Sequence, residues 1–131
     1  MTRILAVDPG DVRIGLAVSD PTGTIARPLD VLQHVSRQKD AEAILQIAHE
    51  LEVEVILVGV ALDREGEMGP QARKAMRLVH ALRAITDLQV ATWDETDTTL
   101  TAQLLERRSR AKLDSLSAAI ILQEFLDAKK H

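Results

Sequence analysis

The order of the hydrophobic patterns along the chain constrains the fold more than any other feature of this sequence. The first quarter contains three segments typical of β-strands, at residues 3–8, 12–19 and 24–33. Short turns rich in proline and glycine separate them, and such connections join antiparallel neighbours. The segments therefore predict an antiparallel meander. Pro28 should place the third strand at a sheet edge or bend it.

Helical and strand patterns alternate through the rest of the chain. Apolar residues at helical spacing between Ala41 and Leu51 predict a helix, with Ser36 as a candidate cap. The later elements are predicted as a strand at Val53–Gly59, a helix from Pro70, a strand at Leu88–Trp93, and helices at Thr98–Arg107 and Leu113–Leu126. We find no internal repeat or linker, so residues 1–131 are interpreted as a single domain.

This order predicts an α/β fold with a mixed five-stranded sheet flanked by helices. Three strands would form the antiparallel meander, and two parallel strands would join it through right-handed crossovers. The strand order resembles that of the ribonuclease H-like fold, in which the first strand is central. Asp8, which ends the first strand, would then lie in the middle of the sheet.

Composition narrows the class of protein. Hydrophobic residues make up 46% and charged residues 27% of the 131 residues, which is ordinary for a globular domain. The chain has no cysteine, which excludes disulfides and thiolate metal sites and agrees with a reducing cytosol. The apolar run before Asp8 is too short for a signal peptide, and no run approaches the ~20 residues of a membrane span. We therefore expect a cytoplasmic protein that does not enter a membrane.

The formal net charge of −4 argues against a protein that coats nucleic acid with a uniformly basic surface. One dense basic cluster nevertheless occurs, at Arg107, Arg108, Arg110 and Lys112. It is explained either by a solvated loop at a helix end or by a loop that grips phosphates. Trp93 and Phe125 are the only aromatic residues, so we expect contacts to phosphates rather than stacking on bases.

Other charged residues give weaker signals. The helix from Pro70 contains Arg73, Lys74 and Arg77, which we interpret as its solvated face. The four histidines do not cluster, and none has the spacing of metal ligands. Neither group predicts a site.

Acidic residues at the ends of predicted elements are the candidate functional residues. Asp8 ends the first strand, Asp94 and Glu95 end the last strand, and Asp114 opens the final helix. Each has a structural explanation, because aspartate stabilises turns and helix N-termini. In the predicted fold, however, all lie at one sheet edge, where their charges repel unless a divalent metal lies between them. This arrangement favours metal-assisted chemistry on a phosphate.

Several motifs together resemble the YqgF (RuvX-type) family over essentially the whole chain. The two most specific stretches are Leu5–Asp20 and Leu113–Gln123. Further matches occur at Ala26–Leu29, Val58–Leu62, Glu67–Ala72 and Asp94–Thr96. Members of this family are described as Holliday junction resolvases and as nucleases that process pre-16S rRNA.

The resemblance implies an acidic active-site trio of Asp8, Glu95 and Asp114 that binds one or two Mg²⁺ or Mn²⁺ ions. It also implies that Arg13, near the first hairpin, belongs to the site, and we expect Arg13 and the basic cluster to contact nucleic acid. The residues themselves leave open whether Asp94 or Glu95 is the metal ligand.

The sequence departs from the family pattern at two places. Thr96 follows Asp94-Glu95 where the family usually has arginine, and this difference removes a candidate phosphate contact. Gly59-Val60-Ala61 replaces the family's Gly-Leu-Pro, which changes a loop beside the expected site but none of the acids.

The expected function is therefore that of a metal-dependent nuclease that hydrolyses phosphodiester bonds in processing the 5′ end of pre-16S rRNA. The expected partners are structured RNA and ribosomal particles, and the expected state is a monomer or weak homodimer. Alternatives are a Holliday junction resolvase on branched DNA and a non-catalytic ribosome- or RNA-associated factor. Nucleotide binding, as in actin-like or sugar-kinase-like ATPases, needs a second lobe for which 131 residues leave no room.

Overall fold

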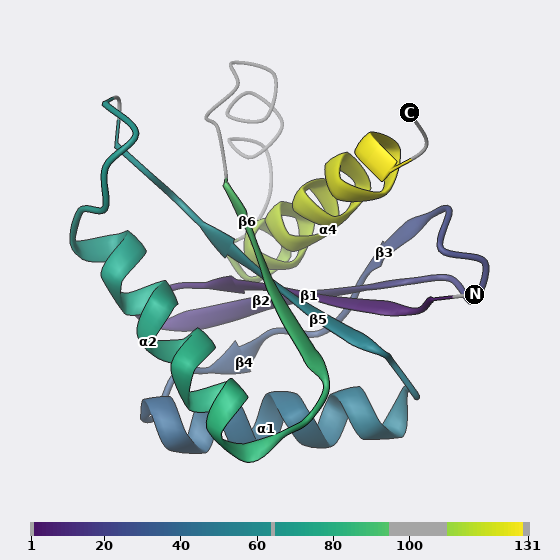
Figure 1. Ribbon diagram of the computed structural model, residues 1–131, viewed down its shortest axis with the longest axis horizontal. Helices are drawn as coiled ribbons and strands as arrows, with labels where there is room; N and C mark the ends of the chain where they lie inside the picture. Colours follow the sequence, from purple (N-terminus) through teal and green to yellow (C-terminus); the bar gives the residue numbers. More distant parts are fainter. Residues whose placement is uncertain (1, 64, 95–109, 130–131) are drawn as a thin grey trace.

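The computed structural model describes residues 2–63, 65–94 and 110–129, and it is built around one twisted, mixed β-sheet (Figure 1). The strands are β1 (Ile4–Pro9), β2 (Arg13–Ser19), β3 (Ala26–Pro28), β4 (Leu32–Gln33), β5 (Val55–Val60) and β6 (Gln89–Asp94). Their order is β3-β2-β1-β5-β6, with β4 also paired to β2. β1 is therefore central, as the ribonuclease H-like strand order predicts.

The pairing directions agree with the predicted topology. β1 and β2 are antiparallel, whereas β1, β5 and β6 are parallel to one another. The carboxyl ends of these three parallel strands consequently lie at the same edge of the sheet, which is where open α/β sheets form their binding sites. The predicted fold class is confirmed.

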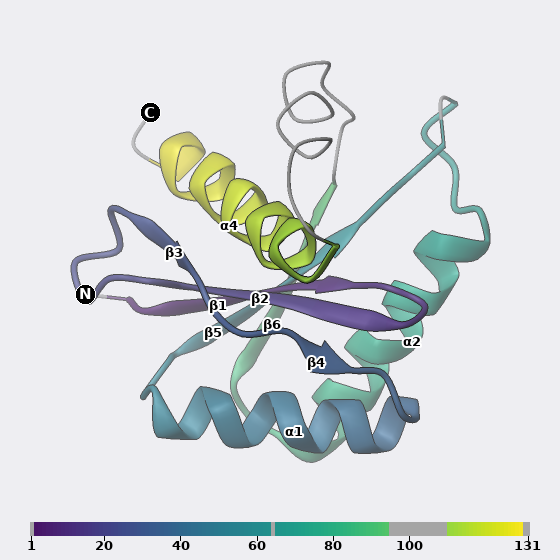
Figure 2. The ribbon, with the colours of Figure 1, turned by 180° about the vertical axis from the view of Figure 1, so that it is seen from behind.

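Helices cover both faces of the sheet (Figures 1 and 2). On one face lie α1 (Arg37–Glu50) and α2 (Pro70–Ile85), and on the other lies α4 (Arg110–Lys129). The predicted cap of α1 is confirmed, because Ser36 Oγ accepts a hydrogen bond from Lys39 N at 3.2 Å. Pro70 occupies the first turn of α2, as expected.

Two apolar clusters fill the space between the sheet and its helices. Leu5, Val7 and Val58 pack against α1 and α2, whereas the alternate residues Ala6 and Leu57 pack under α4. The strands β1 and β5 are thus buried on both faces over most of their length, as expected for parallel strands with helices on each side, whereas the edge strand β6 is partly exposed. The alternation also fixes on which face each residue near the strand ends lies.

The third predicted strand, 24–33, is wrong in one respect, because it forms two short strands and raises the number of strands in the sheet to six. Pro28 has no N–H to donate, and regular pairing with β2 stops there. Leu29 N still bonds Leu16 O at 2.8 Å, and pairing resumes where Leu32 lies opposite Ile14. The prediction that Pro28 lies in an edge strand is confirmed.

The other boundaries differ from the predicted ones by a few residues. β5 begins at Val55 rather than Val53, and the final helix extends in both directions beyond Leu113–Leu126. The helix expected at Thr98–Arg107 lies outside the described residues. Within the described part of the chain, no helix combines the length and the apolar character that a membrane span requires.

Candidate active site

Asp8 lies at the carboxyl end of the central strand β1, with its side chain partly buried. Side chains alternate between the two faces of a strand, and Ile4 and Ala6 pack in the cluster under α4. Asp8 is therefore on the α4 face. Its partner in the β1–β2 ladder is Gly15, so no side chain stands directly opposite the carboxylate on the neighbouring strand.

The turn that follows Asp8 is closely packed and held from outside. A Cβ atom on Gly10 would lie 2.4 Å from a backbone carbonyl oxygen at the start of β2, so glycine is needed there. Asp11, the next residue, accepts hydrogen bonds from Lys74 Nζ at 2.7 Å and from Gln71 Nε2 at 3.2 Å. Lys74 and, to a smaller extent, Gln71 hold the pKa of Asp11 below its usual value. Helix α2 thus holds the turn in place.

Arg13 begins β2 and lies on the same face as Asp8. Its neighbour Ile14 packs in the opposite cluster, with α1 and α2, so alternation directs Arg13 toward α4. Because Asp8 pairs with Gly15, Arg13 is the diagonal neighbour of Asp8 across the ladder, at the spacing of about 7–8 Å that long side chains can bridge. The structure therefore places Arg13, a predicted nucleic-acid contact, near Asp8, a predicted active-site acid.

Asp94 ends β6 at the same edge but on the opposite face. Trp93 packs under α4, where its ring meets the Phe125 ring edge-on at a centroid distance of 5.4 Å. Alternation therefore places Asp94 on the α1–α2 face, away from Asp8. This geometry argues against Asp94 as a partner of Asp8. Glu95, the candidate named above, lies outside the described residues.

Helix α4 directs its first turns toward Asp8. The Gln123 amide donates to Thr24 O at 3.1 Å and accepts from Ala26 N at 3.0 Å, which ties the second half of α4 to β3 (Figure 2). β3 lies beside the end of β2 that pairs with the start of β1. Between residues 123 and 114 the helix axis advances roughly 14 Å. The backbone of Asp114 therefore lies toward the Asp8 end of the sheet.

The predicted basic cluster is described only in part. Arg110 and Lys112 belong to the first turns of α4, so they too begin the helix that points toward the Asp8 end. Arg107 and Arg108 lie outside the described residues. Their role as phosphate contacts stays a prediction.

A divalent metal would find suitable ligand chemistry at this edge. Carboxylate oxygens are the ligands that Mg²⁺ and Mn²⁺ prefer, and Asp8 supplies one carboxylate at the strand end. Among the described residues, which exclude Glu95 and the Asp114 side chain, no group of three His, Cys, Asp or Glu side chains could hold a metal ion. The complete trio therefore stays a prediction.

A cavity of about 290 Å³, which no sequence pattern indicates, lies on the other side of the turn that follows Asp8. The turn lines it together with residues of α1 and α2, among them Lys74 and Arg77. Both belong to the helix face that the sequence predicts to be solvated, and both are exposed. Lys74 and Arg77 share this cavity with residues of α1 because α1 packs beside α2, and no local sequence pattern reveals that packing.

Comparison with known proteins identifies the family. The family model RuvX, described as Holliday junction resolvase, matches residues 2–128. This chain belongs to the RuvX family. A relative from Thermoanaerobacter pseudethanolicus, named as a candidate pre-16S rRNA nuclease, is 43% identical over 98% of this chain and 99% of its own length. A relative of the same name from Roseiflexus is 36% identical over 98% of this chain and 96% of its own.

Solved structures confirm the fold of this RuvX-family chain. RuvC of Thermus thermophilus, in complex with a Holliday junction substrate, matches with a TM-score of 0.65 over 99% of this chain and 96% of that one, at 16% identity. The fowlpox virus resolvase, in complex with Holliday junction DNA, matches with a TM-score of 0.61 over 99% and 100% of the two chains, at 9% identity. The family resemblance inferred from the motifs is confirmed.

Proposed function

We propose that this RuvX-family chain, a single domain of residues 1–131, is a metal-dependent nuclease that hydrolyses phosphodiester bonds in processing the 5′ end of pre-16S rRNA. The observation on which this proposal chiefly rests is the position of Asp8 at the end of the central strand, on the face toward which α4 brings Asp114. The family match and the names of the relatives support nuclease activity. The proposed setting is the cytoplasm, with ribosomal precursor particles as partners.

The proposed metal ligands are Asp8, Glu95 and Asp114. Their carboxylate oxygens fit one or two Mg²⁺ or Mn²⁺ ions, and such ions supply an activated water and stabilise the leaving oxygen of an in-line displacement. Alternation along β6 supports Glu95 over Asp94, because Asp94 lies on the face opposite Asp8.

The other residues of the site bind and orient the substrate. Arg13, diagonal to Asp8 on the same face, would hold a non-bridging oxygen of the phosphate that is cleaved. The close-packed turn at Gly10 keeps Asp8 from shifting when charge develops on that phosphate. Arg110 and Lys112, at the start of α4, would bind neighbouring phosphates.

A second candidate function is resolution of branched DNA. The description of the family model favours it, since that description is Holliday junction resolvase. Symmetric resolution requires two active sites on one junction, so this function requires a dimer at the concentrations at which cleavage occurs.

One experiment separates these functions. Purified protein is incubated with a precursor fragment containing the 5′ end of 16S rRNA and, separately, with a four-way DNA junction, each with Mg²⁺ or Mn²⁺. We expect metal-dependent cleavage of the RNA by the wild type and none by Asp8→Asn. Preferred cleavage of the junction would support the resolvase. Binding without cleavage of either substrate would contradict the nuclease and support an RNA-associated factor.

A further inference from the structure

The cavity beside the Asp8 turn is formed by three separate parts of the chain. Its wall includes Gly10 and Asp11 of the β1–β2 turn, Arg37 at the start of α1, and Lys74 and Arg77 of α2. Its volume of about 290 Å³ is many times the ~30 Å³ that one water occupies in the liquid. It can therefore accommodate a polyatomic ion with part of the molecule to which the ion belongs.

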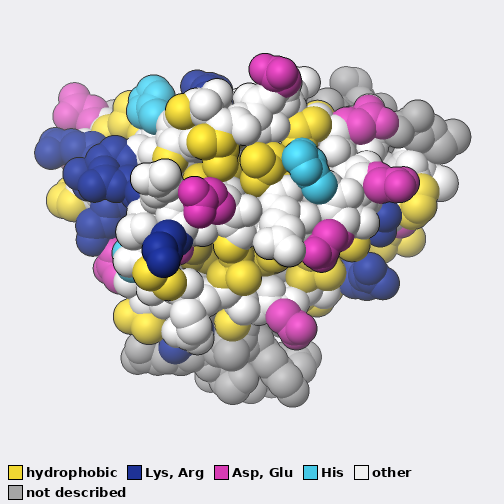
Figure 3. Space-filling view, turned by 90° about the horizontal axis from the view of Figure 1, so that it is seen from below, with side chains coloured by type: hydrophobic (Ala, Val, Ile, Leu, Met, Phe, Trp, Pro, Cys, Tyr) yellow, Lys and Arg dark blue, Asp and Glu magenta, His cyan; other side chains and the backbone are white. Residues whose placement is uncertain are grey.

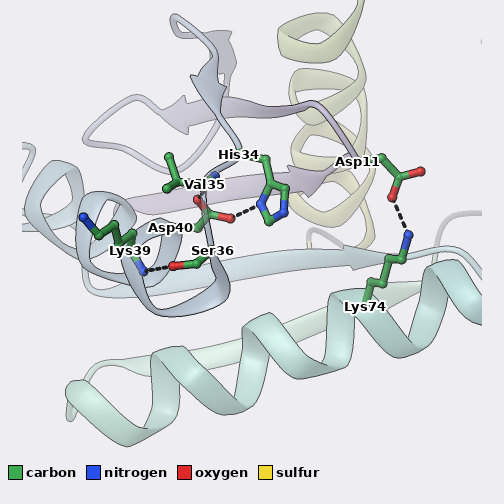
Figure 4. Close-up of polar contacts among 7 residues, drawn as sticks. All are labelled: Asp11, His34, Val35, Ser36, Lys39, Asp40 and Lys74. Carbon is green, nitrogen blue, oxygen red and sulfur yellow. Dashed lines mark hydrogen bonds and ion pairs between the residues drawn. The ribbon is translucent and has the colours of Figure 1, made fainter.

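The acids of this cavity already have cationic or N–H partners. Asp11 pairs with Lys74 Nζ at 2.7 Å. Asp40, only 5% exposed, accepts a hydrogen bond from Val35 N at 3.0 Å and contacts His34 Nδ1. Figure 4 shows the His34 ring between Asp40 and the Asp11–Lys74 pair. The two carboxylates are thus committed to protein groups, which argues against the cavity as a cation site.

The charges that lack a carboxylate partner are positive. Within residues 2–63, 65–94 and 110–129, neither Arg37 nor Arg77 forms an ion pair with an acid. The two arginines come from different helices and line the same cavity. Figure 3, which looks onto the α1–α2 side, shows Lys and Arg side chains gathered at the end where both helices begin. Uncompensated guanidinium groups at one cavity are suited to an anion with several oxygens, such as a phosphate.

We propose that this cavity binds a backbone phosphate of the nucleic-acid strand that is cleaved at Asp8, with Arg37 and Arg77 as the binding residues. This inference rests on the proposed nuclease function and adds a contact on the sheet face opposite the metal site. The turn Pro9-Gly10-Asp11 begins directly after Asp8 and lines the cavity. A strand that crosses the sheet edge at Asp8 would therefore reach the cavity by passing over this turn.

The test compares two double variants that remove the same charge from the same helices. Arg37→Gln/Arg77→Gln removes the two cavity cations, and Lys39→Gln/Arg73→Gln removes one exposed cation from each of α1 and α2 that does not line the cavity. Thermal unfolding of each variant establishes that it folds. Binding of a fluorescent single-stranded RNA from the 16S precursor and of a four-way DNA junction is measured without divalent metal, by anisotropy over a range of salt.

We expect Arg37→Gln/Arg77→Gln to bind the preferred nucleic acid roughly tenfold more weakly, because charge-assisted hydrogen bonds are lost. The slope of log affinity against log salt should fall by about 0.7, as expected for one phosphate of a single strand. The Lys39→Gln/Arg73→Gln variant should keep the wild-type slope. Equal losses in both variants, or none in either, would overturn the proposal, because neither outcome assigns a phosphate to the cavity.

A titration with inorganic phosphate distinguishes a free anion from a nucleic-acid phosphate. If inorganic phosphate shifts the amide resonances of Gly10 and Arg37 while both double variants bind RNA and DNA like the wild type, the cavity binds a free anion and the proposal is wrong. The nuclease proposal is judged separately, by cleavage with metal. Cleavage that depends on Asp8, with no binding loss on removing the cavity cations, would retain the nuclease and reject the phosphate site.

Discussion

Two turns that both begin with Asp-Pro flank β2, one starting at Asp8 and one at Asp20, and the two aspartates have different environments. After β2, Asp20 accepts hydrogen bonds from Thr24 N at 2.8 Å and Ile25 N at 2.9 Å, and it also accepts one from Thr22 Oγ1. These bonds, with Ile25 the largest contributor, hold the pKa of Asp20 far below its usual value. Asp20 is a structural cap of its turn.

The turn before β2 has the same Asp-Pro start at a different place in the sheet. Asp8 ends the central strand on the face covered by α4, whereas Asp20 precedes the edge strand β3. In the Asp8 turn it is Asp11, three positions later, that bonds α2. Asp-Pro therefore predicts a turn in both places, but of the two aspartates Asp8 is the one at the carboxyl end of the central strand, where open α/β sheets form their binding sites.

The largest expected difference between the two turns is in catalysis. Asp8→Asn should reduce metal-dependent cleavage by more than the roughly 100-fold that loss of an outer-shell metal partner can cost, because it removes a proposed ligand. Asp20→Asn should leave the cleavage rate near that of the wild type when both are assayed well below their unfolding temperatures. Single-turnover cleavage measures this difference. Similar rates for the two variants would contradict the assignment of Asp8.

The same contrast applies within β6. Asp94→Asn should retain most of the cleavage activity, since Asp94 lies on the face opposite Asp8, whereas Glu95→Gln should lose it. The same single-turnover assay measures both variants. If Asp94→Asn abolishes cleavage and Glu95→Gln does not, the assignment of Glu95 as the metal ligand is wrong, and the alternation of side chains between the two faces of β6 does not extend to Asp94.

Replacing the glycine of either turn by alanine should destabilise the protein, but only the replacement in the Asp8 turn should also slow cleavage. Gly10→Ala places a Cβ 2.4 Å from backbone oxygen, and overpacking of this kind costs about 1–3 kcal/mol of folding free energy. Gly23→Ala strains a residue at φ +72° and costs about 1–2 kcal/mol. Urea unfolding should detect both losses, but only Gly10→Ala should also lower cleavage. Equal effects on cleavage would show that the Asp8 turn has no special role.

A smaller effect, on the affinity for RNA, is expected from removing the charge of Asp11 in the turn that follows Asp8. Asp11→Asn removes a carboxylate from the cavity and frees Lys74, so RNA should bind several-fold more tightly, in line with the loss of one nearby negative charge. Asp20→Asn removes the same charge at the opposite end of β2 and should leave the affinity unchanged. Anisotropy without metal measures both. If both variants bind RNA more tightly, the effect comes from the net charge of the protein and not from the position of Asp11 at the cavity.

Part of the fold and of the candidate site could be predicted from the sequence, and part could not. The meander, the crossovers and the Ser36 cap follow from periodicity and turn residues, which are local signals. The central position of Asp8 follows from the resemblance of the strand order to the ribonuclease H-like fold, in which the first strand is central. The shared cavity of Arg37 and Arg77 does not, because it depends on how α1 packs beside α2. The face of Asp94 could have been inferred from alternation once the last residue of β6 was known, but strand ends are the least certain part of such predictions.

The smallest expected effect is in acid stability. Because the pKa of Asp20 is lower in the folded protein than its usual value of 3.8, its stabilising contribution is complete above that value and is lost as pH falls toward the folded pKa. Asp20→Asn should therefore unfold at a lower temperature than the wild type at neutral pH, and the difference should shrink below about pH 4. Thermal unfolding followed by circular dichroism over this range measures it. If the difference in unfolding temperature between the two proteins stays constant as the pH falls, the charge of Asp20 does not contribute to the stability of its turn.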